Sequence, residues 1–321
     1  MQFRLKKIRS DASFREFFRL HKGKKTSIVV MAKKERFKNL IVYSAINNFL
    51  RKNGIYSPKL ISENFKAGIM EIEDFGNNTL LYHVKHSKNK LNIYKKCIDI
   101  ILKIQKIKAP QKIRYGINKY FKLNNYNAAN LHKDSNLFLH WYLPGVLGKK
   151  KSLKHRKNIR KELNKLYKKI FFKNRFIVHR DFHISNIMRP GKKLAIIDTQ
   201  DLILGNPMYD VASLIDDVRY KVPLQIKRKI FEFYFKKCSM KKREIELLKN
   251  DFDILSVQRN LKILGIFFRL FKRDNKPQYL KYLPYTWNLI ELRMKNEIFK
   301  NLKTVLKKAV NNKIRKKRNF K

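Results

Sequence analysis

The chain of 321 residues is 44% hydrophobic and 12% aromatic, a composition that excludes an intrinsically disordered polypeptide. A chain of this length can bury a sizeable core, and two lobes are favoured over one. No apolar run reaches the length of a membrane span, and the N-terminus lacks the apolar stretch of a signal peptide, so we expect a cytoplasmic protein without a membrane partner. Cys97 and Cys238 lie far apart in the sequence, which argues against a disulfide framework and a cysteine metal cluster.

The formal net charge of +53 would suit a nucleic-acid-binding protein. However, the excess is mostly lysine and is spread along the chain, and the other abundant residue types share AT-rich codons with lysine. We therefore attribute the charge to base composition that loads solvated faces with lysine, and we expect no specific nucleic-acid partner. The densest basic block, 313–321, is expected to be a frayed tail.

The first eighty residues predict a small lobe of strands and one helix. Ser10–Ser13 is a turn signal, and β-branched, apolar runs follow it. Apolar residues at helical spacing predict a helix over 37–52 that ends at Asn53–Gly54. The expected strands are 14–20, 26–32 and 68–74, with a further strand after Ser57.

From Asn78 onward the sequence is mainly helical, because apolar residues recur at three- and four-residue spacing. The segment 120–131 is rich in Asn and is expected to form a loop. The expected helices are 91–107, one that begins within 136–143, 150–172, 211–218, 226–235, 241–248, 252–271 and 291–310.

The stretch 176–217 carries the residues best suited to chemistry. Apolar runs at 176–178 and 194–197 predict two short strands, joined by a turn at Pro190–Gly191. Acidic and amide oxygens gather at the ends of these runs. They belong to Asp181 and Asn186, beside His179 and His183, after the first run, and to Asp198, Gln200 and Asp201 after the second.

This pattern is typical of phosphoryl transfer. Hard cations such as Mg²⁺ prefer oxygen ligands and neutralise the charge of the phosphates. Asn186 and Asp198 can supply an amide oxygen and a carboxylate to the metal, while Asp181 accepts the proton of the acceptor hydroxyl. The spacing matches the H-x-D-x-x-x-x-N grammar of kinases, although Asp198-Thr199-Gln200 is not the D-F-G of a protein kinase.

These motifs resemble the aminoglycoside phosphotransferase / choline kinase-like family. Within it, the chain is most similar to the cell-wall-recycling kinases that phosphorylate the anomeric hydroxyl of N-acetylmuramate and N-acetylglucosamine. Further stretches in family order support the resemblance. They are 10–15 (SDASFR), 73–76 (EDFG), 141–143 (WYL) and 257–265 (VQRNLKILG).

The resemblance implies roles for residues outside the catalytic stretch. The main chain at 73–76 would meet the adenine as the hinge between lobes, and Ser13 would lie in the turn over the phosphates. The implied nucleotide-binding residues are Ser13, Lys33, Glu73 and Phe75; the implied acceptor-binding residues are Trp141, Gln200 and Arg259; His179 and Asp210 are implied supports.

Several of these residues have a plainer interpretation that the sequence leaves open. Ser13 suits an ordinary hairpin turn, and Trp141 suits a core aromatic pair with Tyr142. Arg259 suits an ion pair with Asp201 or Asp253. Lys33 matches the kinase strand only loosely, and His140 stands where the family pattern often has an acidic residue before the Trp.

Together these features predict an α+β, protein-kinase-like two-lobed fold, with a small mixed N-lobe containing an antiparallel sheet and a larger, mainly helical C-lobe. We expect the boundaries 1–76, 77–312 and, for the basic tail, 313–321. The predicted function is an ATP- and Mg²⁺-dependent phosphotransferase that converts an amino sugar, N-acetylmuramate or N-acetylglucosamine, to its 1-phosphate. The alternatives are the same fold acting on an aminoglycoside, choline-like or homoserine-like acceptor, and a basic nucleic-acid-binding protein with a degenerate kinase fold.

Overall fold

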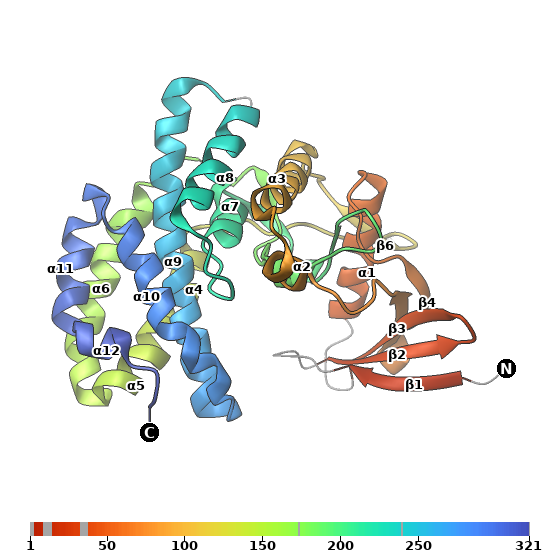
Figure 1. The fold of residues 1–321 in the computed structure, drawn as a ribbon, viewed down its shortest axis with the longest axis horizontal. Helices are drawn as coiled ribbons and strands as arrows, with labels where there is room; N and C mark the ends of the chain where they lie inside the picture. Colours follow the sequence, from red (N-terminus) through yellow and green to blue (C-terminus); the bar gives the residue numbers. More distant parts are fainter. Residues whose placement is uncertain (1–2, 9–14, 33–37, 173, 239, 321) are drawn as a thin grey trace. The chain divides into compact units, whose positions relative to one another are not determined.

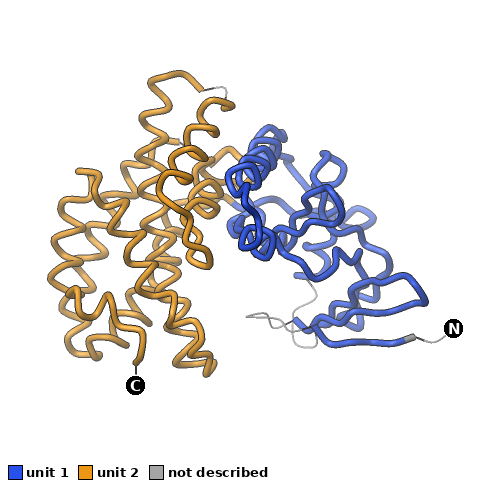
Figure 2. The backbone as a smooth tube through the Cα atoms, viewed as in Figure 1, with its two compact units in different colours: residues 1–124, 179–203 blue, residues 125–178, 204–321 orange. Residues whose placement is uncertain are grey.

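The computed structural model describes residues 3–8, 15–32, 38–172, 174–238 and 240–320. The chain forms two compact units, coloured separately in Figure 2. Unit 1 contains Met1–Asn124 and His179–Ile203, and unit 2 contains Asn125–Val178 and Leu204–Lys321. The lobe boundaries expected from the sequence stay a prediction.

Unit 1 is built on a five-stranded antiparallel sheet, drawn in red and orange in Figure 1, with strand order β1-β2-β3-β5-β4. Val30 of β3 and Met70 of β5 face each other across the sheet and pack with Leu40 and Tyr43 of helix α1. This mixed lobe is the one that the sequence predicts. The strands are β1 (Phe3–Ile8), β2 (Glu16–Lys22), β3 (Lys25–Met31), β4 (Leu60–Asn64) and β5 (Ile69–Glu73), and α1 spans Lys38–Lys52.

The other elements that the structure describes in unit 1 are two helices, two small hairpins and short 3₁₀ turns. The helices are α2 (Leu80–His86) and α3 (Lys90–Lys106); the hairpins are β6 (Ile113–Gly116) with β7 (Lys119–Phe121), and β9 (Ile187–Met188) with β10 (Ala195–Ile196); the 3₁₀ turns are η1 (Phe65–Ala67), η3 (Ile184–Asn186) and η4 (Thr199–Asp201).

The pairing of the strands in the catalytic stretch differs from the prediction. We expected the runs 176–178 and 194–197 to form one pair of strands. Instead β10 pairs with β9, and β8 (Phe176–Val178) pairs with β11 (Ile203–Gly205). The reason is the length of the intervening polar loop: it leaves room for β9, a two-residue strand whose Ile187 and Met188 are too few to produce a pattern.

Unit 2 is almost entirely helical, as the sequence predicts for this part of the chain (Figure 1). A π-helical segment, η2 (Phe138–Tyr142), joins α4 to α5 without a break. The other helices are α4 (Ala128–Leu137), α5 (Leu143–Leu147), α6 (Lys149–Lys168), α7 (Met208–Ile215), α8 (Leu224–Lys237), α9 (Lys242–Asp274), α10 (Leu283–Arg293), α11 (Lys300–Ala309) and α12 (Asn312–Lys316), with 3₁₀ turns η5 (Pro277–Tyr282) and η6 (Glu297–Phe299).

Helix α9 is one helix of 33 residues, although two separate helices were expected. The polar stretch that suggested a break contains Asp251, which is fully buried. Its carboxylate accepts hydrogen bonds from the backbone N–H groups of Phe171 and Phe172 and from the Asn206 side chain. Because three donors satisfy the buried carboxylate, Asp251 does not have to reach solvent in a loop, and the helix continues past it.

Close backbone contact explains a glycine in the middle of α9. A Cβ atom on Gly265 would lie 2.2 Å from the carbonyl carbon of Leu137, the last residue of α4 before η2. Only glycine allows α9 to approach this segment so closely.

Two other expectations for the segments around the helices of unit 2 are wrong in detail. The segment 120–131 is not one loop, because Asn127 and Asn130 form a capping box that starts α4. The predicted helix 291–310 is divided: α10 ends at Arg293, and Asn296 caps η6 before α11 begins.

The basic tail is anchored at its first turn, contrary to our expectation of a frayed segment. The buried Arg315 of α12 donates to the Val310 carbonyl and to Glu291, at 2.8 and 2.7 Å. Its guanidinium also lies 4.6 Å from the centre of the Trp287 ring, a cation–π contact.

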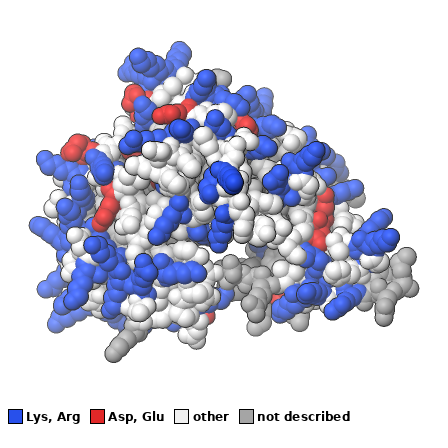
Figure 3. All heavy atoms as spheres, viewed as in Figure 1, with Lys and Arg blue, Asp and Glu red and all other residues white. Residues whose placement is uncertain are grey.

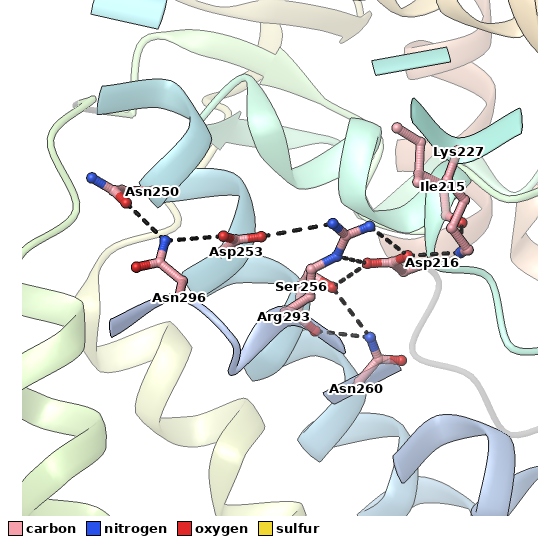
Figure 4. A network of polar contacts seen from close by, with 9 residues as sticks. All are labelled: Ile215, Asp216, Lys227, Asn250, Asp253, Ser256, Asn260, Arg293 and Asn296. Carbon is pink, nitrogen blue, oxygen red and sulfur yellow. Dashed lines mark hydrogen bonds and ion pairs between the residues drawn. The ribbon is translucent and has the colours of Figure 1, made fainter. Parts of the chain in front are cut away.

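A buried ionic network joins four helices of unit 2 (Figure 4). Asp216, which is fully buried, accepts hydrogen bonds from Lys227, Arg293 and Ser256 at 2.6–3.0 Å. Burial alone would raise the pKa of Asp216, but Lys227 and Arg293 together hold it well below its usual value. The network therefore balances a buried negative charge with two cations.

Replacing Asp216 with Ala should destabilise the protein by about 3–5 kcal/mol, because two buried or half-buried cations lose their counter-ion. Chemical denaturation measures the loss. Asp274→Ala, at an exposed pair with Arg273, is the matched control and should leave the free energy of unfolding nearly unchanged. Equal stability of the two variants would contradict the central role of Asp216.

Candidate active site

The loop after β8 is held by backbone and side-chain bonds that start from His179. This histidine is fully buried, its Nε2 lies 3.0 Å from the Ile197 carbonyl oxygen, and its ring meets Phe182 edge-on. The next residue, Arg180, has a left-handed φ of +73°, which is uncommon for a residue with a side chain. The anchored histidine and the left-handed backbone at Arg180 precede Asp181 within this turn, and the supporting role of His179 stays a prediction.

Asp181 and Asn186 are joined directly. The Asn186 side-chain Nδ2 donates to the Asp181 carbonyl oxygen at 3.1 Å, and the Asn186 backbone donates to His183 at 2.8 Å. With Nδ2 used in this way, Oδ1 is the oxygen that the amide can offer to a metal ion. Both side chains are half-buried, so they can contact solvent or a ligand.

Asp198 follows β10 and has a left-handed backbone as well, with φ +63° and ψ 41°. The preceding residue, Ile197, donates its N–H to the Asn186 carbonyl oxygen at 3.0 Å. The hairpin therefore links the segment of Asn186 to that of Asp198. The Asp198 carboxylate accepts a hydrogen bond from Gln200 at 2.7 Å, so Gln200, predicted to contact the acceptor, is bound to the candidate metal ligand.

Helix α1 contacts the segment around Asp198 through residues that the sequence analysis did not single out. The buried Thr199 hydroxyl donates to the Asn47 Oδ1 at 2.7 Å. The Tyr43 hydroxyl interacts with Asn47 and with the Asp198 backbone, and burial, together with the Asp198 charge, raises the pKa of Tyr43 to about 12. Tyr43 and Asn47 are one helical turn apart, and that spacing on an otherwise apolar face was the only signal in the sequence.

The predicted hinge is fixed by an ion pair that the sequence does not reveal. Arg19 of β2 donates two hydrogen bonds to the Asp74 carboxylate, at 2.6 and 3.0 Å. Burial alone raises the pKa of Asp74, but the bonds from Arg19 and from the Gly76 N–H lower it below its usual value. The segment 73–76 is therefore held in one conformation by a charged carboxylate.

The two hinge residues predicted to bind nucleotide have structural contacts. The Glu73 carboxylate accepts hydrogen bonds from Tyr56, Arg51 and the Lys59 N–H. Phe75 packs with Met188 and Ala195 of the β9–β10 hairpin. A contact with adenine would thus involve the main chain at these positions, as expected from the resemblance.

Three predicted site residues belong to unit 2: Asp210, Trp141 and Arg259. Asp210 is buried in the first turn of α7. Trp141 is half-buried within the π-helical segment, a kind of irregularity that is frequent at functional sites. Its neighbour Tyr142 is a core residue: it is fully buried, stacks on Phe138 and accepts a hydrogen bond from Trp287.

Arg259 does not pair with either carboxylate that was considered for it. Asp201 lies 3.8 Å from Arg180, and Asp253 lies 3.8 Å from Arg293. Arg259 is only 3% exposed, and its Nη1 has no hydrogen-bond acceptor among the described residues. A buried guanidinium nitrogen without an acceptor is costly, and a bound ligand can supply one.

Ser13 and Lys33 lie outside the described residues, so their predicted contacts with nucleotide remain predictions. Arg15, two residues after Ser13 in the sequence, is buried with its guanidinium carbon 5.9 Å from the centre of the Tyr43 ring.

The donor set fits a magnesium site of the kinase type. In the described part of the chain, no cluster of three or more His, Cys, Asp and Glu side chains is arranged to hold a metal ion. A site with one amide and one carboxylate ligand needs no such cluster, because phosphates and water complete the coordination of Mg²⁺. Asn186 and Asp198 are the residues that would hold it.

The surface agrees with the view that the positive charge is dispersed. Lys and Arg side chains are scattered over the face shown in Figure 3, with no single continuous stripe. Nor does any helix of the described ranges have the length and apolarity needed to cross a membrane.

The fold, and the loop after β8 that carries Asp181 and Asn186, are typical of a phosphotransferase. Comparison with known proteins agrees with this class. A family model described as the phosphotransferase enzyme family matches residues 4–234, so the chain belongs to that family. The chain is therefore a phosphotransferase enzyme, as the sequence predicts.

Among characterised relatives, two N-acetylmuramate/N-acetylglucosamine kinases are similar over most of their length. The protein from Pseudomonas aeruginosa is 28% identical over 88% of this chain and 81% of its own. The protein from Neisseria meningitidis is 24% identical over 88% of this chain and 83% of its own.

Solved structures share the fold at low sequence identity. Spectinomycin phosphotransferase APH(9)-Ia, in complex with ADP and spectinomycin, gives a TM-score of 0.61 at 13% identity, with 92% of this chain and 93% of that chain covered. Choline kinase LicA from Streptococcus pneumoniae gives 0.60 at 14%, with 94% and 93% covered. These matches confirm the predicted fold class.

Replacing Thr199 with Val should lower both stability and turnover, because the buried Asn47 Oδ1 loses its donor beneath Asp198. We expect a loss of about 1–3 kcal/mol in the free energy of unfolding, measured by denaturant titration, together with a fall in kcat. Thr199→Ser keeps the hydroxyl and should restore both. A Val variant with unchanged kcat would show that this bond does not position Asp198.

Proposed function

We propose that the protein transfers the γ-phosphoryl group of ATP to the anomeric hydroxyl of an amino sugar, N-acetylmuramate or N-acetylglucosamine, to give the sugar 1-phosphate. The observation that carries the reaction type is the bonded loop and hairpin that presents Asp181, Asn186 and Asp198 from one compact unit. Support for the acceptor comes from relatives named N-acetylmuramate/N-acetylglucosamine kinase that match most of the chain.

In this proposal Asp181 is the general base. Its carboxylate orients the anomeric hydroxyl and accepts its proton as the oxygen attacks the γ-phosphorus. The bond from the γ-phosphorus to the bridging oxygen breaks, and ADP leaves with the electron pair. The backbone strain at Arg180 and the bond from Asn186 keep the Asp181 main chain in place during the step.

Asn186 and Asp198 are proposed to hold Mg²⁺, which when bound neutralises charge on the phosphates. The bond from Gln200 and the support from Thr199 fix the Asp198 carboxylate for this task. For the acceptor side we propose Trp141 and Arg259. The Arg259 Nη1, which has no acceptor among the described residues, can donate to a carboxylate or hydroxyl oxygen of the acceptor. N-acetylmuramate carries such a carboxylate on its lactyl ether.

A second candidate function keeps the same chemistry and changes the acceptor to an aminoglycoside or a choline-like alcohol. The residue that raises this alternative is His140, which stands where the family pattern often has an acidic residue; it is exposed beside Trp141, and burial together with Arg156 and Arg160 lowers its pKa. A cation-binding acceptor site would be expected to carry carboxylates there, and the basic surroundings of His140 therefore favour the sugar.

Replacing Asp181 with Asn should lower kcat by about a hundred-fold or more, since the amide cannot accept the proton. Release of ADP measures turnover, and the thermal shift with ATP and Mg²⁺ should persist. Asp201→Asn, at an exposed carboxylate in the same stretch, is the matched control and should leave kcat nearly unchanged. An Asp181 variant that keeps more than a tenth of wild-type turnover would refute the base assignment.

An acceptor panel with ATP and Mg²⁺ tests the proposed substrate. We expect N-acetylmuramate and N-acetylglucosamine to gain one phosphoryl group by mass spectrometry, and the 1-O-methyl glycoside of N-acetylglucosamine to gain none, because it lacks the free anomeric hydroxyl. Turnover of choline or an aminoglycoside, but not of the amino sugars, would overturn the acceptor and leave the kinase assignment intact.

A further inference from the structure

A hollow of about 870 Å³ opens on the surface of unit 1, and none of the candidate catalytic or metal-binding residues lines it. One wall is the end of α1 with the segment that follows it, including Arg51 and Tyr56. A second wall is one face of α3, and the third is the turn between β9 and β10. All of these elements lie within the same compact unit.

The charge of the lining favours an anion. Arg51 and four lysines contribute five cations, against two carboxylates. Of the two carboxylates, Glu73 is bonded to Tyr56, Arg51 and a backbone N–H, so it offsets Arg51 rather than the lysines, and Asp99 on α3 leaves the four lysines in excess. None of the four lysines has a hydrogen bond or ion pair among the described residues. They are Lys96, Lys103, Lys192 and Lys193.

The lysines converge from two elements rather than one. Lys96 and Lys103 lie seven residues apart, two turns along the same face of α3, and the two others lie side by side in the β9–β10 turn. Such an arrangement places positive charge on two of the walls. An anion with more than one charged group could contact both walls at once.

The base of the hollow is apolar. Ile55 and Ile196 are buried, and Ile100 and Leu194 are half-buried beside them. Apolar lining with a few charged groups at the rim is typical of small-molecule sites. The lining thus suits an organic anion that has a carbon skeleton as well as phosphate or carboxylate groups.

The hollow is bonded to the hairpin that carries the candidate metal ligands. Ile196, which lines it, donates its N–H to the Tyr56 carbonyl oxygen at 2.9 Å. The next residue along the chain, Ile197, donates to the Asn186 carbonyl oxygen at 3.0 Å and precedes Asp198. A ligand that restricts the motion of the β9–β10 turn would therefore also restrict the motion of Asn186 and Asp198, the two candidate metal ligands.

We propose that this hollow is a second binding site for a small organic anion, bearing phosphate or carboxylate groups, and that its occupancy steadies the β9–β10 hairpin. The binding itself is independent of the proposed function. Its consequence, a regulatory effect on phosphoryl transfer through Asn186 and Asp198, rests on that function.

Calorimetric titration of the full chain without Mg²⁺ tests the site, with pyrophosphate as the phosphate probe and citrate as the carboxylate probe. Lys192→Glu/Lys193→Glu should weaken binding of the preferred probe by about ten-fold or more, since two attractive charges become repulsive. The matched control is Lys24→Glu/Lys25→Glu, an exposed lysine pair at the β2–β3 turn of the same unit, which should bind as the wild type does. Asp198→Asn should also leave the affinity unchanged.

Hydrogen exchange gives a readout separate from affinity: the bound probe should slow exchange of the Ile196 and Ile197 amides in the wild type but not in the Lys192/Lys193 variant. Equal weakening by the two lysine-pair variants, or binding that depends on Asp198, would overturn the proposal, as would wild-type protein that binds neither probe. A chain that binds a probe but transfers no phosphoryl group would refute the proposed function alone. A chain that transfers phosphate but binds neither probe would refute only the second site.

Discussion

The candidate active site depends on one short set of hydrogen bonds, those that tie the loop after β8 to the β9–β10 hairpin. His179 meets the carbonyl oxygen of Ile197, and the N–H of Ile197 bonds to Asn186, whose side chain returns to Asp181. Three residues with oxygen-bearing side chains are thereby fixed by backbone partners. Because the partners are main-chain groups, the arrangement tolerates variation in the surrounding side chains, which agrees with a fold shared at identities of 9–15% with the solved structures.

Much of this could be predicted from the sequence. The β-branched, apolar run at Ile28–Val30 located a strand of the sheet, and helical spacing located α1 and α3. The order of H-x-D, Asn and Asp indicated phosphoryl transfer, because that chemistry requires those oxygen types. The pattern best located the helices and strands that are long enough for buried positions to recur along them.

Other features could not be predicted, for physical reasons. Strand β9 has two residues, so it carries no period, and the partner of β8 was assigned wrongly. Asp251 resembles a helix break in sequence, and only its three donors from distant segments allow α9 to continue. Likewise Arg19 and Asp74 are 55 residues apart, and no local rule pairs them. Tyr43 and Asn47 resemble ordinary helix residues until Thr199 is placed beside them.

Through Arg315, helix α12 is connected by a chain of contacts to the segment that holds Trp141, a candidate acceptor-binding residue. The Arg315 guanidinium covers Trp287, Trp287 donates to Tyr142, and Tyr142 belongs to the π-helical segment that also holds Trp141. Proteolytic trimming after residue 316 would spare this relay, whereas a cut before Arg315 would uncover the indole face and loosen the backing of Trp141. An affinity handle can therefore be attached to the end of the basic segment, provided that α12 is left whole.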